Sequence, residues 1–145
     1  MAVVGTADLF GMSGAELDQL FGASPAGPIP NGAAKGMAII APGTPFCAEI
    51  ADIINIFAWQ GKTFDAQHGV LTNKLLPIGL NAIVAEVYQG PSWYDQKDCI
   101  VLDYSKTSLL AHWIRDEIRL IAPSLYLGRV YWDQTPLIHF SLQFE

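Results

Sequence analysis

The stretch Leu137-Ile138-His139-Phe140-Ser141-Leu142-Gln143-Phe144, near the end of the 145-residue chain, alternates in character from one residue to the next. Successive side chains of a strand point to opposite faces, so this pattern predicts a strand with one apolar face. That face would carry Ile138, Phe140, Leu142 and Phe144. Upstream of it, turn signals such as Gln67-His68-Gly69 separate further expected strands at 61–65, 70–76, 80–88, 98–104 and 125–132.

Helical signals dominate the first 60 residues. Ser13 and Glu16 form a capping-box pair that predicts a short helix at 13–21. Thr44 and Pro45 suit the start of a second helix, which would end before Gly61. The Pro- and Gly-rich segment at 22–43 between them is expected to be a loop or an extended arm.

A third helix is expected to start near Ser108 and to stop before Pro123. Its apolar side would be formed by residues at helical spacing, namely Leu110, Trp113, Ile114, Ile118 and Ile121. Arg115, Asp116 and Arg119 would lie on its polar side.

These elements predict an α+β fold: mainly an antiparallel β-barrel or strongly curved sheet, with two N-terminal helices and one helix inserted between strands. We expect one domain over 1–145, in which 1–60 forms an arm that packs on a barrel-like body at 61–145. The six predicted strands are fewer than a complete eight-stranded barrel needs. A small barrel of this kind can hold one small ligand.

The chain is acidic and poor in charge. Fourteen Asp and Glu stand against eight Lys and Arg, a formal net charge of −6, which disfavours nucleic acid because phosphate binding needs a basic surface. Only 15% of residues are charged, against about a quarter in an average domain. Such a surface would be hidden in a homo-oligomer, wrapped around an apolar pocket, or placed against a membrane.

The sequence also bears on the location of the protein and on the state of its cysteines. No segment reaches the roughly 18 apolar residues of a transmembrane helix, and no signal peptide is visible, so a cytoplasmic location is expected. Cys47 and Cys99 lack a metal-type spacing and are expected to be reduced and buried.

The segment from Trp59 onward resembles a lipocalin-like (calycin-type) barrel. A predicted helix leads into Trp59-Gln60-Gly61-Lys62, which is similar to the strand entry of those proteins. Ala58 precedes the tryptophan, so the full GxWxG pattern is absent. A meander follows through 61–77 and 99–105. The resemblance implies an internal apolar cavity open at one end, and no particular chemistry.

Asp103 and Tyr104 are the first candidate catalytic residues, because they end the apolar run at 99–102. A carboxylate facing the cavity would have a raised pKa and could act as a general base, with Tyr104 as acid. The alternative is that Asp103 caps the following turn by accepting a hydrogen bond near Ser105.

Three further candidates are charged or titratable. Arg115 could stabilise a developing oxyanion and Arg119 could bind a ligand carboxylate. The alternative is an ion-pair network that ties their segment to the barrel. His139 could act as an acid near neutral pH, although a lone histidine is more often structural.

Four residues are candidates for ligand binding. Trp93 lies in a predicted loop and could form a binding rim or pack on the arm. Tyr126 and Trp132 share one strand face and could line the cavity or fill the core. Lys74 could anchor an anion, or serve as an ordinary edge-strand lysine.

Three functions remain open. The first is a cofactor-free acid–base enzyme of the isomerase, cyclase or lyase type, acting on a hydrophobic or aromatic substrate. The second is a carrier or sensor of a hydrophobic, carboxylate-bearing ligand, and the third is an oligomeric interaction domain. No metal site, phosphate loop, dinucleotide fingerprint or serine-hydrolase elbow occurs in the sequence, so no cofactor is expected.

Overall fold

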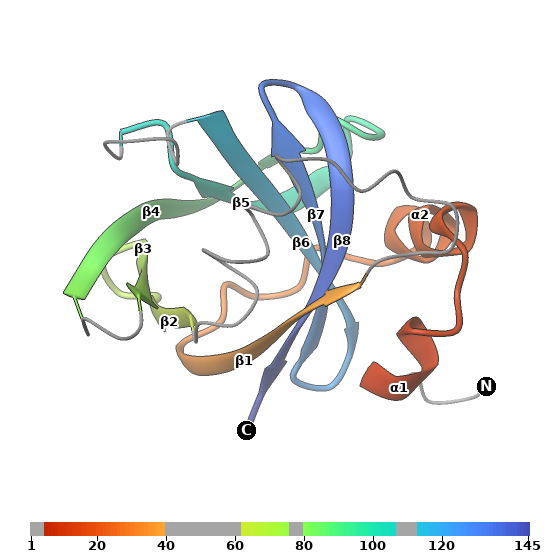
Figure 1. Cartoon of the computed structure of the whole chain (residues 1–145), viewed down its shortest axis with the longest axis horizontal. Coiled ribbons are helices and arrows are strands. Elements are labelled where there is room, and N and C mark those ends of the chain that lie inside the picture. The colour runs from red at the N-terminus through yellow and green to blue at the C-terminus, as the bar shows by residue number, and fades with distance from the viewer. Residues whose placement is uncertain (1–4, 40–61, 76–79, 107–112) are drawn as a thin grey trace.

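The structure is a computed structural model that describes residues 5–39, 62–75, 80–106 and 113–145. Eight antiparallel strands form a closed barrel in which each strand pairs with the next and the last pairs with the first (Figure 1). The strands are β1 (Gly32–Ile39), β2 (Lys62–Asp65), β3 (Val70–Leu75), β4 (Leu80–Pro91), β5 (Asp98–Asp103), β6 (Ile114–Ala122), β7 (Leu125–Trp132) and β8 (Thr135–Phe144). The predicted α+β fold with an antiparallel barrel is confirmed.

Two short helices precede the barrel, α1 (Thr6–Leu9) and α2 (Gly14–Ala23). The predicted helix at 13–21 is α2, and its capping box is present: Ser13 Oγ accepts from the Glu16 amide at 3.1 Å. The helix predicted from Thr44 lies outside the described residues, as does Cys47. In the described part of the chain, no helix is long and apolar enough to cross a membrane.

Strand β1 lies inside the segment that was predicted to be only a loop or arm. Its residues are mostly Gly and Ala, which have low strand propensity, so the sequence carries little sign of it. Pairing on both sides decides its conformation: Ala34 lies opposite Lys62 on β2 and Phe144 on β8. This strand closes the barrel.

The third predicted helix is wrong for its described part, because Ile114–Ala122 forms strand β6. Both faces of β6 are largely buried, and such a strand loses the clean polar–apolar alternation that reveals strands in a sequence. Asp116 lies on the inner face between Ile114 and Ile118, which hides that alternation further. The apolar residues then matched a helical spacing by coincidence.

Alternate residues from all eight strands line the barrel interior and pack against one another. The face of β8 predicted to be apolar is part of this core, through Ile138, Phe140, Leu142 and Phe144. Gly128 on β7 faces the Phe140 ring so closely that a Cβ there would lie 2.2 Å from its Cζ. Each fully buried Leu, Ile or Phe side chain contributes about 1.5–3 kcal/mol.

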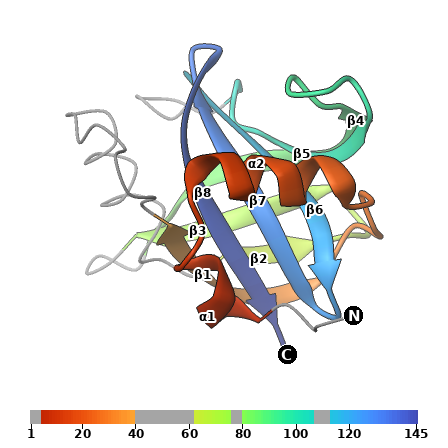
Figure 2. The same ribbon diagram turned by 90° about the vertical axis from the view of Figure 1, so that its right-hand side faces the viewer.

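Helices α1 and α2 cover the outside of the barrel and form a second, smaller core. Figure 2 shows α2 lying across β6, β7 and β8. Leu17 and Phe21 of α2 pack with Cys99, Val101 and Leu127 from the outer barrel face. Cys99 is a buried free thiol whose pKa burial raises to about 12, as expected for a reduced structural cysteine.

The segment between α2 and β1 crosses one end of the barrel (Figure 1). Its Pro25 carbonyl accepts from the Leu120 amide at 3.0 Å, its Pro28 carbonyl from Tyr126 Oη at 2.7 Å, and Ile29 packs on the interior core. Gly27 has φ +74°, and a Cβ there would lie 2.6 Å from Leu120 Cβ, so only glycine fits this crossing.

The opposite end of the barrel is where β2 and β6 begin and where β5 ends. The crossing segment forms a hydrogen bond with Leu120 near the end of β6. Ile114, at the start of β6, therefore lies toward the opposite end of the barrel. Gly32, at the start of β1, pairs with Phe64, so Lys62 at the start of β2 also lies toward the far end.

Candidate functional site

Asp116 is a buried carboxylate in the wall of the barrel. Its neighbours across the sheet are Leu102 on β5 and Val130 on β7, both part of the interior core, and it is 2% exposed. Its Oδ1 has no hydrogen-bond partner among residues 5–39, 62–75, 80–106 and 113–145. Leaving such a group unsatisfied costs about 1–3 kcal/mol or more, so an unpaired buried carboxylate oxygen needs a reason, such as a ligand, a water molecule or a catalytic role.

Lys62 and Tyr104 lie in the same interior. Lys62 is also 2% exposed, and its inward direction follows from its pairing with Ala34, which belongs to the interior core. Lys62 Nζ donates to Tyr104 Oη at 3.1 Å. Tyr104 follows β5 and is fully buried in the core. We call these three residues, Lys62, Tyr104 and Asp116, the interior cluster.

Burial shifts the titration of both charged members toward neutrality. It lowers the pKa of Lys62 from 10.5 to about 8, against the attraction of Asp116, which acts to raise it. It raises the pKa of Asp116 from 3.8 to about 7, against the attraction of Lys62. Both groups can therefore gain or lose a proton near physiological pH, which is the property required of general acids and bases.

The interior cluster holds the components of proton transfer. A carboxylate with a pKa near 7 can remove a proton, while an ammonium group and a phenol can donate hydrogen bonds to developing negative charge. The apolar wall around them strengthens these interactions. Among the residues that the structure describes, no group of three or more His, Cys, Asp or Glu side chains could hold a metal ion.

Asp103 does not belong to the cluster. Its side chain shares the outer face of β5 with Val101, which packs under the helices. Oδ1 accepts from the Ser105 amide at 2.9 Å and Oδ2 from Tyr88 Oη at 2.8 Å. Partial burial acts to raise the pKa of Asp103, but these hydrogen bonds outweigh it and lower the pKa. The predicted cavity-facing orientation is wrong, and the turn-capping alternative is confirmed.

Arg115 also faces outward. It therefore does not reach the barrel interior, where its predicted role of stabilising an oxyanion would place it. Its Nε and Nη2 donate to Glu117 Oε2 at 3.1 and 3.0 Å, and its guanidinium stacks 4.3 Å from the centre of the Trp93 ring. Glu117 is fully buried and accepts from Ser92 Oγ and the Trp93 amide as well. These contacts fasten the 92–97 loop to β6.

Arg119 has every donor occupied. It forms a bidentate pair with Asp95 at 2.7 and 2.8 Å and donates to the backbone carbonyls of Phe21, Lys97 and Asp98. No donor remains for the predicted ligand carboxylate. The alternative of an ion-pair network is confirmed, with the difference that these arginines extend from a strand and tie it to α2 and a loop.

His139 lies on the outer face of β8, beneath α2. Its Nε2 is 2.8 Å from Asp18 Oδ1, and the same carboxylate pairs with Arg129. Burial lowers the pKa of His139, against the attraction of Asp18. From this face His139 does not reach the interior cluster, and its role as an acid stays a prediction. A small hollow of about 220 Å³ lies beside the pair.

The remaining candidates divide between the two sides of the wall. Tyr126 and Trp132 face the interior, as predicted, and Tyr126 Oη is used to hold the crossing segment. Lys74 lies in β3, and its side chain is outside the described part of the structure.

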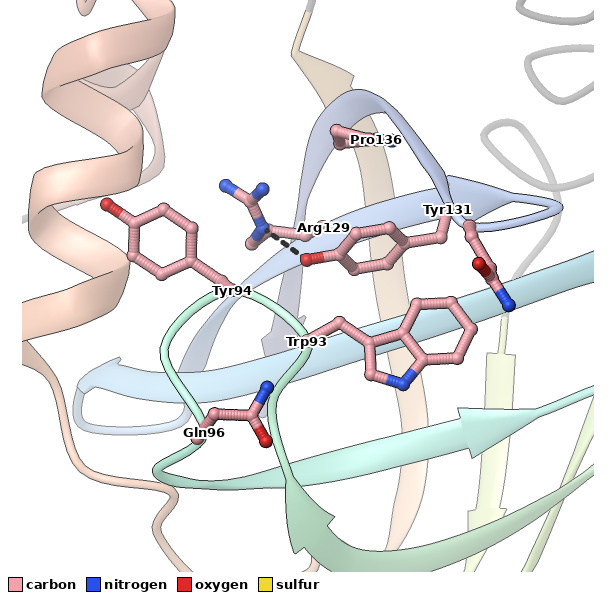
Figure 3. A pocket seen from close by; sticks show the side chains of 7 residues that line it. Trp93, Tyr94, Gln96, Arg129, Tyr131 and Pro136 are labelled. Carbon is pink, nitrogen blue, oxygen red and sulfur yellow. Dashed lines mark hydrogen bonds between the residues drawn. The ribbon is translucent and has the colours of Figure 1, made fainter.

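Trp93 lines a groove on the outside of the barrel (Figure 3). Trp93 and Tyr94 are 44% and 42% exposed there, and Tyr131 Oη accepts from Arg129 Nε at 3.2 Å between them. The groove measures about 510 Å³. The polar groups of Arg129 are engaged by Asp18 and Tyr131, so the groove is lined by rings and an internally paired cation.

The sequence does not predict two members of the interior cluster, Asp116 and Lys62, as site residues. Asp116 was noticed as a charge but placed on a helix, whereas its position between Ile114 and Ile118 in an extended chain would have turned it inward. Lys62 was seen only as part of a strand entry. Tyr104 was predicted as an acid, and it lies in the cluster.

Comparisons with known proteins support the fold. No family model matches the chain, and no curated protein matches it. The crystal structure of a protein from Thermomonospora curvata matches with a TM-score of 0.65 and 16% identity, over 92% of this chain and 88% of that chain. A likeness at this identity shows a shared fold. A closed eight-stranded antiparallel barrel fits the calycin-like shape that the segment after Trp59 resembles.

Proposed function

We propose that the protein is a cofactor-independent acid–base enzyme that acts on a small, mainly apolar molecule in the barrel interior. Asp116 would remove a proton from the substrate, and Lys62 and Tyr104 would stabilise the negative charge that develops. The unpaired Asp116 Oδ1 carries the proposal, because none of the residues that the structure describes forms a hydrogen bond with it. The sequence pointed to the same class of reaction with Asp103 as base.

The pKa values support this assignment. With a pKa of about 7, Asp116 is partly ionised at neutral pH and is a much stronger base than an ordinary carboxylate. Asp103, with its lowered pKa and two hydrogen bonds, is a weaker base than usual. The interior apolar residues would bind the body of a hydrophobic or aromatic substrate of the isomerase or lyase type.

A nitrobenzisoxazole tests the base directly, because removal of one carbon-bound proton opens its ring and produces a coloured phenolate. We expect the purified protein to accelerate this reaction and the rate to rise with pH around 7. Asp116→Asn should lower the rate about 100-fold, a usual contribution of a general base. Asp103→Asn is the matched control and should leave the rate unchanged. Loss of rate in Asp103→Asn alone would contradict the assignment.

A carrier of a hydrophobic ligand is the second candidate, and the apolar wall of the barrel favours it. Displacement of a neutral fluorescent probe such as aminoanthracene would measure binding separately from turnover. Binding without acceleration in the preceding assay would favour the carrier. The arginine clamp expected for a ligand carboxylate has no support, since Arg115 and Arg119 are paired with Glu117 and Asp95. A homo-oligomeric assembly stays a prediction, which native mass spectrometry would test.

A further inference from the structure

The interior cluster contains an amine as well as a carboxylate, and the two need not act in the same way. Lys62 is the first residue of β2 and extends into the core, where its Nζ lies 3.1 Å from the Tyr104 hydroxyl. Asp116, also buried and with Oδ1 unpaired, interacts electrostatically with it. A buried lysine beside a proton donor and a carboxylate with one unpaired oxygen is the arrangement needed for covalent catalysis by an amine.

We propose that Lys62 forms a Schiff base with an aldehyde or ketone, and that carbonyl compounds with an apolar body are the substrate class of this barrel. The inference rests on the proposed function and specifies how negative charge at the substrate is absorbed. A protonated imine withdraws electrons from the neighbouring carbon. Asp116 then removes the proton from that carbon and leaves an enamine instead of a free enolate.

The covalent step balances without any further reagent. The Nζ lone pair attacks the carbonyl carbon, and the C=O π electrons move to the oxygen, which takes a proton from Tyr104 Oη. The nitrogen loses a proton and returns the phenol to its starting form by way of the 3.1 Å contact. Tyr104 Oη then donates its proton again, this time to the hydroxyl group, which leaves as water while the nitrogen lone pair forms the C=N bond. The nitrogen holds its remaining proton as the protonated imine and returns it to the phenolate when the imine becomes neutral. The sum is amine plus carbonyl giving imine plus water.

The surroundings favour the neutral amine, which is the reactive form. An ordinary lysine is almost entirely protonated at pH 7. Burial gives Lys62 a pKa of about 8, so about a tenth of its amine is unprotonated at that pH. Lys35 and Lys97 are exposed and provide internal controls in the same molecule. Dehydration of the adduct is also aided by an interior from which water is largely excluded.

Reductive trapping tests the proposal. The whole protein is incubated at pH 7 with hydrocinnamaldehyde and sodium cyanoborohydride, which reduces a protonated imine in preference to the free aldehyde, and is then digested and mapped by mass spectrometry. We expect one hydrocinnamyl group on Lys62, at least about tenfold more abundant than on Lys35 or Lys97, because of these three only Lys62 has the Tyr104 hydroxyl beside its amine and an apolar interior around it. Lys62→Arg should remove the preferred label, and Tyr104→Phe should slow its appearance. Equal labelling of all lysines, or labelling only of exposed ones, would overturn the proposal.

Two readouts separate this proposal from the general acid–base function. The nitrobenzisoxazole has no carbonyl group, so its ring opening depends on Asp116 and not on an imine. Trapping at Lys62 with normal labelling in Asp116→Asn supports the Schiff base even when the base assay fails. Ring opening without any trapping at Lys62 leaves the acid–base function standing and rejects the imine. If Lys62→Arg does not fold, the peptide map of the unmodified sequence still decides.

Discussion

Among the described glycines, Gly128 has the least room for a side chain. A Cβ at this position would lie 2.2 Å from Phe140 Cζ and 2.3 Å from its Cε1, so the ring rests directly on the backbone of β7. We predict that Gly128→Ala lowers the free energy of unfolding by about 1–3 kcal/mol, the usual effect of overpacking a core. Urea unfolding followed by tryptophan fluorescence would measure it.

Gly36→Ala is the matched control, since a Cβ there would be 3.4 Å from Leu142 Cδ2, an ordinary contact. It should change stability much less. Adding Phe140→Leu to Gly128→Ala should recover part of the loss, because the smaller side chain gives the new methyl group room. Equal stability of the two alanine variants would show that the Phe140 ring moves aside at no cost.

At individual residues, the sequence revealed the types of side chain in the site better than their directions. The sequence predicts Tyr104 as an acid of the cavity, and it lies in the interior core together with Ile100 and Leu102. The sequence does not decide whether the Asp103 side chain faces a cavity or caps a turn, because a strand that ends at a turn can satisfy a carboxylate locally. Asp116 could not be placed, since its direction depends on β6 being a strand.

Arg119 connects three elements of the molecule through hydrogen bonds. It links β6 to the Phe21 carbonyl at the end of α2 and to Asp95 and Lys97 in the loop before β5. We predict that Arg119→Met lowers the free energy of unfolding by about 3 kcal/mol, because it leaves the partly buried Asp95 carboxylate without its partner. It should also speed hydrogen exchange of the α2 amides beyond the change in global stability.

Lys97→Gln is the control for this element. It changes an exposed side chain in the same loop and keeps the backbone carbonyl that Arg119 uses, so stability and α2 exchange should stay the same. If Arg119→Met unfolds at the same urea concentration as Lys97→Gln, then the Arg119 contacts do not stabilise the attachment of the helix.

Six strands were predicted from alternation and turn signals, and all six exist. The two that were missed share a physical reason: their conformation is set by neighbours distant in sequence. β1 consists mainly of Gly and Ala and is extended because β2 and β8 flank it. β6 is covered outside by α2 and inside by the barrel core, so both its faces are largely buried and its period is hidden.

The interior cluster should make the free energy of unfolding of the whole molecule depend on pH. The pKa of Asp116 rises to about 7 on folding, so between about pH 4 and 7 the folded state holds a proton that the unfolded state has lost. Stability from this group is therefore present at low pH and is lost as the pH rises through 7. The pKa of Lys62 falls to about 8, so between pH 8 and 10.5 the unfolded state holds the extra proton and stability rises with pH.

The double variant Lys62→Met/Asp116→Asn removes both titrating groups. We predict that the unfolding free energy of the unmodified protein minus that of the double variant has a minimum between about pH 7 and 8. The slopes on either side should reach about 1 kcal/mol per pH unit. Urea unfolding at a series of pH values measures the difference, in which the other titrating groups cancel. Asp103→Asn should behave oppositely, because a lowered pKa gives stability that is present above about pH 4 and lost below it. A pH-independent difference for the double variant would contradict the raised and lowered pKa values.

The closure of the barrel by β1 sets an order on its assembly. Ala34 pairs with Phe144 near the other end of the sequence, and contacts so distant along a chain form later than hairpins such as β7–β8. Lys62 pairs directly with β1, whereas Asp116 is fixed by β5 and β7. The amine and the carboxylate are therefore expected to meet only in the final folding step, so a partly folded chain would not carry the reactive pair.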